Sequence, residues 1–215
     1  MKKSLEMDLE DGRIPRLIPV DPDEQNHHND LWAMYCHAED YEEIMEHART
    51  EYYKVSLDVF SQVMAKDDSR LSLLSNDYFK LSQEKKFLDF IERGFKLNEN
   101  ECYIDLGTFS DRKALIDFFT KQLSNCDRID QIILLNQFDL LKESTNTIYL
   151  ITDSNLLKTF FKLFLRESLW NCLYFNKVPV LIKSNYDISI PLIFRNEQDK
   201  KTYEKLAKQS DLFFL

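Results

Sequence analysis

Residues 147–170 read TIYLITDSNLLKTFFKLFLRESLW, and this stretch contains both kinds of secondary structure on which the fold depends. Its first six residues, TIYLIT, are rich in β-branched and aromatic side chains, which is typical of a strand. From Ser154 to about Trp170 the apolar residues follow helical spacing and cover more than half of the helix circumference. We therefore expect a strand followed by a helix that is almost completely enclosed.

The same alternation of strands and helices continues on both sides of this stretch. Strands are predicted at 102–106, 173–175, 178–183 and 188–194, and helices at 110–123 and 197–208. Asn196 is a suitable cap for the last helix. Residues 132–135 are ambiguous, and 212–215 are expected to dock as a strand or tail. These elements predict a mixed-sheet α/β section over residues 99–215.

The first part of the chain has a different pattern. Residues 1–29 hold three of the five prolines and are predicted to be an extended arm with one short strand around 16–20. Residues 30–98 are predicted to be helical, with two shorter helices around 70–80 and 83–93 and Gly94 just after the second. A long first helix is expected from an apolar stripe formed by Leu31, Met34, Ala38, Tyr41, Met45, Ala48, Tyr52, Val55 and Val59.

This order of elements predicts an α+β fold, in which a helical N-terminal section packs on a mixed-sheet C-terminal section as one compact unit. The composition supports a folded chain, because 44% of the residues are hydrophobic and 28 of them are Phe, Tyr or Trp. A disordered chain would be poor in these residue types.

The charge balance argues against a protein that binds duplex nucleic acid. The formal net charge is −9, with 37 acidic and 28 basic residues, and no basic stripe is present. Binding to duplex DNA depends mainly on Lys and Arg that neutralise phosphates. An acidic protein of this kind is better suited to a partner protein with a basic surface.

The cysteines and the N-terminus favour the cytoplasm. Cys36, Cys102, Cys126 and Cys172 lie far apart and form no CxxC pair, which is typical of reduced thiols. The first ten residues are charged and lack the apolar core of a secretion signal. The longest apolar stretches contain charges, so no membrane-spanning helix is expected.

The scarcity of glycine excludes several families of nucleotide-binding enzyme. Only Gly12, Gly94 and Gly107 occur in the chain, so neither GxGxxG nor GxxxxGK[ST] is present. Such loops need glycine where the backbone approaches phosphate closely. GxSxG and HExxH are also missing. No cofactor is predicted.

All four histidines lie within 21 residues, which suggests a zinc site. On a helix, Cys36 and His47 share one face with Asp40 and Glu43, and His27 and His28 could approach from the arm. Thiolate and neutral imidazole are good ligands for Zn²⁺. The alternative is that this face lies opposite the apolar stripe and is simply the solvated side of the helix.

A second possible metal site involves carboxylates next to the predicted strands. Asp105 lies in the strand CYIDL and Asp153 directly follows TIYLIT, with Asp111 as a third candidate. If these strands end at a common edge, the carboxylates could hold Mg²⁺ or Mn²⁺ for hydrolysis of a phosphodiester. The alternative is that Asp111 and Asp153 stabilise the starts of the helices that follow them.

Because catalytic motifs are missing, we expect an interaction protein of the immunity-protein, antitoxin or phage-accessory kind. Carboxylates on the first predicted helix would then meet a basic surface on a partner protein. The alternatives are a metal-dependent hydrolase or nuclease, and a homo-oligomeric structural protein that uses the 31–59 stripe as its interface. The predicted acidic patch consists of Glu39, Asp40, Glu42, Glu43 and Glu46.

Overall fold

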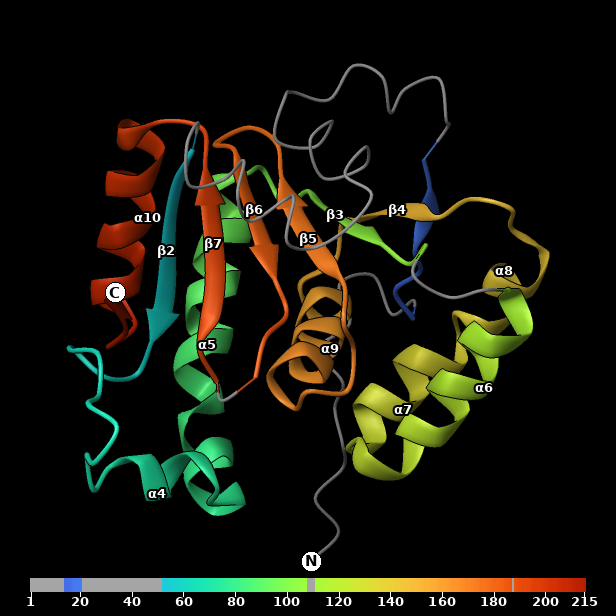
Figure 1. Ribbon diagram of the computed structural model, residues 1–215. Helices are drawn as coiled ribbons and strands as arrows, with labels where there is room; N and C mark the ends of the chain where they lie inside the picture. Colours follow the sequence, from blue (N-terminus) through green and yellow to red (C-terminus); the bar gives the residue numbers. More distant parts are fainter. Residues whose placement is uncertain (1–13, 21–51, 108–110, 187) are drawn as a thin grey trace, which may run out of the picture.

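The fold is built on an eight-stranded sheet with the strand order β1-β4-β3-β5-β6-β7-β2-β8 (Figure 1). The computed structural model describes residues 14–20, 52–107, 111–186 and 188–215. Within these ranges the strands are β1 (Ile18–Pro19), β2 (Tyr53–Asp58), β3 (Cys102–Asp105), β4 (Ile148–Ile151), β5 (Cys172–Phe175), β6 (Val180–Lys183), β7 (Ile190–Phe194) and β8 (Phe213–Phe214).

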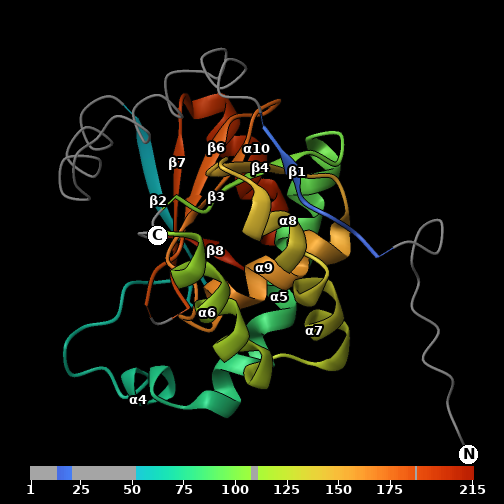
Figure 2. The same cartoon turned by 90° about the vertical axis from the view of Figure 1, so that its right-hand side faces the viewer.

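Helices cover one side of this sheet, and α5, α9 and α10 lie directly against it (Figures 1 and 2). A short 3-10 turn, Leu123–Asn125, separates α6 from α7. The described helices are α4 (Leu71–Leu74), α5 (Asp77–Leu97), α6 (Arg112–Gln122), α7 (Arg128–Leu135), α8 (Phe138–Glu143), α9 (Ser154–Leu165) and α10 (Glu197–Gln209).

The α+β class predicted from the sequence is confirmed, but the sheet is not mixed. Every strand pairing in the described part of the chain is antiparallel. Strands β5, β6 and β7 follow one another through short loops, and such loops can join only antiparallel neighbours, because a parallel pair needs a long crossover.

The long helix expected to reach Val59 is wrong in its last part. Residues 53–58 form β2, which lies between β7 and β8. Val55 and Leu57 are buried in the core, whereas Lys54, Ser56 and Asp58 on the other face are partly exposed. A few apolar residues spaced by two and four fit a strand as well as a helix. Residues 30–51, with the rest of the stripe, lie outside the described residues.

The two helices predicted around 70–80 and 83–93 are present as α4 and α5, but the break between them lies at 75–76 and Gly94 lies inside α5. A Cβ atom at Gly94 would lie 3.3 Å from the Phe175 ring and 3.4 Å from the Tyr203 ring. This glycine therefore permits close packing of α5 on β5 and α10. The chain turns instead at Glu99 and Asn100, whose φ angles are 60° and 63°.

The main core lies between the sheet and the helices, and α9 is its most enclosed helix, as predicted. All seven apolar residues of α9 are buried. The helix ends at Leu165, earlier than expected, because Glu167 takes a left-handed conformation with φ 55°. From the sheet, Ile104, Tyr149 and Leu173 face this same core.

The opposite face of the sheet has a smaller apolar cluster of its own. Cys172, Tyr174, Leu181 and Ile193 are fully buried there, together with Ile148. Val20 belongs to this cluster and Tyr52 packs against it. These two residues border the segment 21–51, which the structure does not describe.

Only residues 14–20 of the predicted N-terminal arm are described, and they include β1. Gln137 holds this segment: its Oε1 accepts from the Leu17 N–H at 2.8 Å, and its Nε2 donates to the Pro15 carbonyl at 2.9 Å. In the described part of the chain, no helix is both long and apolar enough to cross a membrane.

Candidate binding site

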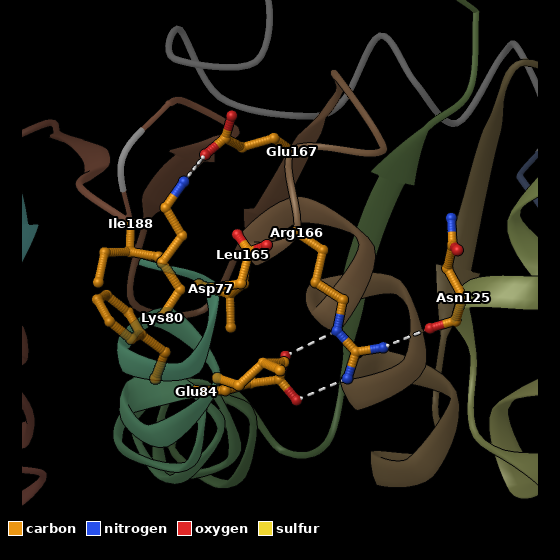
Figure 3. A pocket seen from close by; sticks show the side chains of 10 residues that line it. Asp77, Lys80, Glu84, Asn125, Leu165, Arg166, Glu167 and Ile188 are labelled. Atoms are coloured by element: carbon orange, nitrogen blue, oxygen red, sulfur yellow. Dashed lines mark hydrogen bonds and ion pairs between the residues drawn. The ribbon is translucent and has the colours of Figure 1, made fainter. Parts of the chain in front are cut away.

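A cavity of about 440 Å³ opens where the start of α5 meets the end of α9 (Figure 3). Phe87, Leu165 and Ile188 supply its apolar lining. Its remaining lining residues are Leu81 and the polar residues Asp77, Lys80, Glu84, Asn125, Arg166 and Glu167. The cavity thus combines an apolar floor with a charged rim, as small-ligand and side-chain pockets commonly do.

Helix α5 provides half of this lining because of its periodicity. Positions 77, 80, 81, 84 and 87 recur every three or four residues and therefore share one helix face. Asn76 fixes the start of the helix, since its side chain accepts from the Phe79 N–H at 3.0 Å. Asp77 is consequently held at the mouth of the cavity in an exposed position.

Arg166 is the best-anchored group in the cavity. Its Nε and one terminal nitrogen donate to the two Glu84 oxygens at 2.8 and 2.9 Å, and the other terminal nitrogen donates to the Asn125 carbonyl at 2.9 Å (Figure 3). These hydrogen bonds with Glu84 raise the pKa of Arg166. A two-pronged contact of this kind fixes the guanidinium plane as well as its position.

The second ion pair joins Lys80 to Glu167 at 2.7 Å across the rim. The rim therefore carries three carboxylates, on Asp77, Glu84 and Glu167, but only two cations. Asp77 forms no ion pair with any residue in the described ranges. The positive end of α5 offsets part of the excess, by on the order of half a charge, so a smaller negative surplus remains.

Large apolar side chains are exposed around this end of the molecule. Tyr78 is 84% exposed and Leu81 56% exposed on the first turns of α5. Trp170 and Tyr186 lie on the loops that also contribute Glu167 and Ile188, and their rings pack with centroids 4.3 Å apart. Exposed aromatic residues beside a pocket are typical of surfaces that bind other proteins.

The cavity offers charged and apolar side chains to a ligand. The described residues that line it include no Ser, Thr, Cys or His. Both rim cations are already held by carboxylates, so the rim offers negative charge rather than a site for an anion.

Three cations on α9 and at its C-terminal cap tie the cavity to the rest of the helical layer. They recur every four residues, and each binds acids on α5 or at the start of α7. Lys158 contacts Glu92 at 2.6 Å. Lys162 contacts Asp130 at 2.7 Å and Asp127 at 3.0 Å, while Arg166 completes the row with its Glu84 pair.

The aspartates proposed as metal ligands stabilise local backbone structure. Asp153 caps α9 by accepting from the N–H groups of Asn155 and Leu156 at 2.8 and 2.9 Å. Asp111 caps α6 by accepting from Ala114 N–H at 2.7 Å. Both contacts match the capping role that the sequence left open as an alternative.

The register of the sheet keeps Asp105 and Asp153 apart. Asp105 lies opposite Ile148, whereas Cys102 lies opposite Ile151, so the two aspartates follow opposite ends of the β3–β4 pair. The Asp105 carboxylate accepts from the Gly107 N–H at 2.7 Å, and burial raises its pKa. The described residues contain no group of three or more His, Cys, Asp or Glu placed to hold a metal ion.

The other predicted site residues lie outside the described residues. These are the zinc candidates Cys36, His27, His28 and His47, and the acidic patch of Glu39, Asp40, Glu42, Glu43 and Glu46. Sequence reasoning missed the cavity at the start of α5. The only signal for it was the alternation of acidic and basic residues at 77, 80 and 84 on one helix face.

Comparison with known proteins assigns no family to this chain. No protein-family model matches it, and neither the curated proteins nor the solved structures include a significant match.

Proposed function

We propose that this protein is a cytoplasmic interaction module that receives a basic side chain of a partner protein in the cavity between α5 and α9. The observation that carries the proposal is the surplus of carboxylate on the rim, with Asp77 unpaired among the described residues at its mouth. A net charge of −9 would also accelerate encounter with a basic partner. Such a module would be of the immunity-protein, antitoxin or phage-accessory kind.

The cavity suits the two parts of an Arg or Lys side chain. The aliphatic stem would pack on Leu81, Leu165 and Ile188, and the charged head would reach the rim carboxylates. Tyr78 and Leu81 would add apolar contact area around the entry and exclude water from the charge contact inside.

The test compares two small probes that differ only in charge. N-acetyl-arginine amide and the neutral isostere N-acetyl-citrulline amide are titrated into the full chain while backbone amide NMR shifts are recorded. Saturable shifts at 77–87 and 165–167 are expected for the arginine probe alone, with a dissociation constant on the order of millimolar. Equal shifts with both probes, or none with either, would refute the proposal.

Two variants separate the site from general charge effects. Asp77→Asn should weaken binding of the arginine probe roughly fivefold, the effect of a charge interaction partly screened by water. Asp139→Asn is the matched control, because Asp139 is also an exposed acid in the first turn of a helix, α8. It should leave the affinity unchanged.

A further inference from the structure

We infer that Lys80 occupies the cavity as an internal cation, and that the basic side chain of the partner displaces it from Glu167. This inference rests on the proposed function and specifies how binding at the same site is controlled. The Lys80 Nζ atom lies 2.7 Å from Glu167 Oε1, across the rim of the cavity (Figure 3). The partner would therefore exchange one ammonium–carboxylate contact for its own.

The two cations of the rim are held with very different strength. Arg166 makes a two-pronged contact with Glu84 and a third hydrogen bond to the Asn125 carbonyl. Among the described residues, Lys80 makes one ion pair, with Glu167. A guanidinium bound on both sides of its fork keeps a single geometry, whereas an ammonium on a flexible four-carbon stem can turn away. Lys80 is therefore the cation that can leave.

The contact between Lys80 and Glu167 is accessible to water. The two side chains are 22% and 27% exposed, so the ion pair lies at the opening of the cavity and not in the core. Partly exposed ion pairs contribute little net stability, because water solvates the separated charges almost as well. When a second cation reaches Glu167, the Lys80 ammonium can move into solvent while its aliphatic stem stays on the protein surface.

Glu167 lies at a position where glycine is the preferred residue. It follows the cap residue of α9 and has a left-handed φ of 55°. Its N–H donates to the Phe164 carbonyl at 3.0 Å, and the Ser168 N–H donates to the Leu163 carbonyl at 2.9 Å, which together close the end of the helix. Glycine takes this conformation without the steric cost that a side chain adds. Helix termination therefore does not require glutamate here, whereas a rim that binds cations does.

Displacement of Lys80 also removes a like charge from the path of the partner. Lys80 follows Asp77 by three residues and precedes Glu84 by four, so its stem lies between these two carboxylates on one helix face. While Lys80 is paired with Glu167, its ammonium repels a second cation that approaches Asp77. Binding to the native chain should consequently be weaker than the surplus of carboxylate alone would give.

The experiment compares the affinity for N-acetyl-arginine amide in the wild type and in Lys80→Met, measured by amide NMR shifts at 77–87 and 165–167. Methionine keeps most of the apolar stem and removes the charge. Lys80→Met should bind the probe roughly fivefold more tightly, because the competing cation and its repulsion are both removed. Lys85→Met is the matched control, because Lys85 also lies on α5 and pairs with Asp89 at 2.6 Å but does not line the cavity. It should leave the affinity unchanged.

A double variant identifies the carboxylate involved. Lys80→Met/Glu167→Gln should lose the gain in affinity, since glutamine keeps the shape of glutamate without its charge. If the wild type binds the probe and Lys80→Met binds it no more tightly, this inference fails and the proposed function stands. An equal gain in Lys85→Met would attribute the effect to net charge and would also overturn the inference. If neither the wild type nor Lys80→Met binds the probe, both fail.

Discussion

Replacing Lys162 by methionine should destabilise the fold by about 3 kcal/mol, because it removes the counterion of a buried carboxylate. Asp130 is only 3% exposed, and its two oxygens accept from Lys162 Nζ and Thr159 Oγ1, both at 2.7 Å. Methionine has a similar length without the charge. Breaking such a pair costs about 3–5 kcal/mol, and the remaining Thr159 hydrogen bond places this case at the lower end.

The stability lost in Lys162→Met should also depend on pH, and the direction of this dependence follows from the pKa of Asp130. Burial already raises the pKa of Asp130 while Lys162 lowers it, so removing Lys162 raises this pKa further. A carboxyl with a raised folded-state pKa favours the folded state only while it is protonated. Its contribution is therefore lost as pH rises through that pKa. The destabilisation should be smaller at pH 4 than at pH 7.

Urea unfolding at both pH values provides the measurement. Lys201→Met is the matched control, because Lys201 pairs with Glu197 at 3.1 Å with both side chains more than half exposed. Such a surface pair contributes less than about 1 kcal/mol. A Lys162→Met loss below about 1 kcal/mol at pH 7, or a loss of equal size at both pH values, would refute the assignment of Asp130 as a buried charge.

Two further substitutions test the core and the sheet. Asn98→Ala should lower the free energy of unfolding, measured in urea, by about 2–3 kcal/mol. Asn98 is 2% exposed, donates to the Tyr203 hydroxyl at 2.7 Å and accepts from the Val178 N–H at 2.8 Å. A loss below about 1 kcal/mol would contradict these buried hydrogen bonds. Burial raises the pKa of Asp105, so the contribution of Asp105 to stability should fall as pH rises above about 4. Asp105→Asn should remove this contribution and retain the Gly107 hydrogen bond, so the variant should gain stability relative to the wild type between pH 4 and pH 7. A stability difference between the two proteins that is the same at both pH values would contradict it.

The C-terminal part of the fold could be predicted because its signals are local. Asn196 caps α10 by accepting from the Asp199 N–H at 2.9 Å, and the polar start and apolar stripe of α9 are visible in the chain itself. A helix cap and the periodic spacing of apolar residues along a helix depend only on neighbouring residues. The approximate positions of β3 to β7 followed from similarly local apolar runs.

β2 could not be predicted in this way because its partners are distant in sequence. Tyr53 lies opposite Phe194, and Leu57 lies opposite both Ile190 and Phe214. No residue near 53–58 carries information about that pairing, and the short apolar pattern fits the spacing of a helix as well as that of a strand. The strand directions were missed for the same reason, and with them the separation of Asp105 from Asp153.

The cavity was harder still to predict, since it is assembled from four separate segments. Asp77 and Glu84 share a helix face on α5. Asn125 joins them from the 3-10 turn before α7, Arg166 from the end of α9 and Ile188 from the loop before β7, and only tertiary packing brings these segments together. Arg166 directly follows the apolar helix α9, where a charge marks a helix end or a specific partner. The sequence alone could not decide between these.

The position of this cavity at the end of α9 shows how the proposed binding site can coexist with a tightly packed core. Lys158 and Lys162 fix α9 against α5 and α7 through partly buried ion pairs. Arg166 lies one helical turn further on, so the position of its backbone is fixed by the helix while its side chain lines an open cavity. Sites supported by well-packed elements hold their geometry better than sites on free loops. A partner would then meet a rim whose charges are already oriented, and specificity would depend on Asp77 and the exposed apolar residues around it.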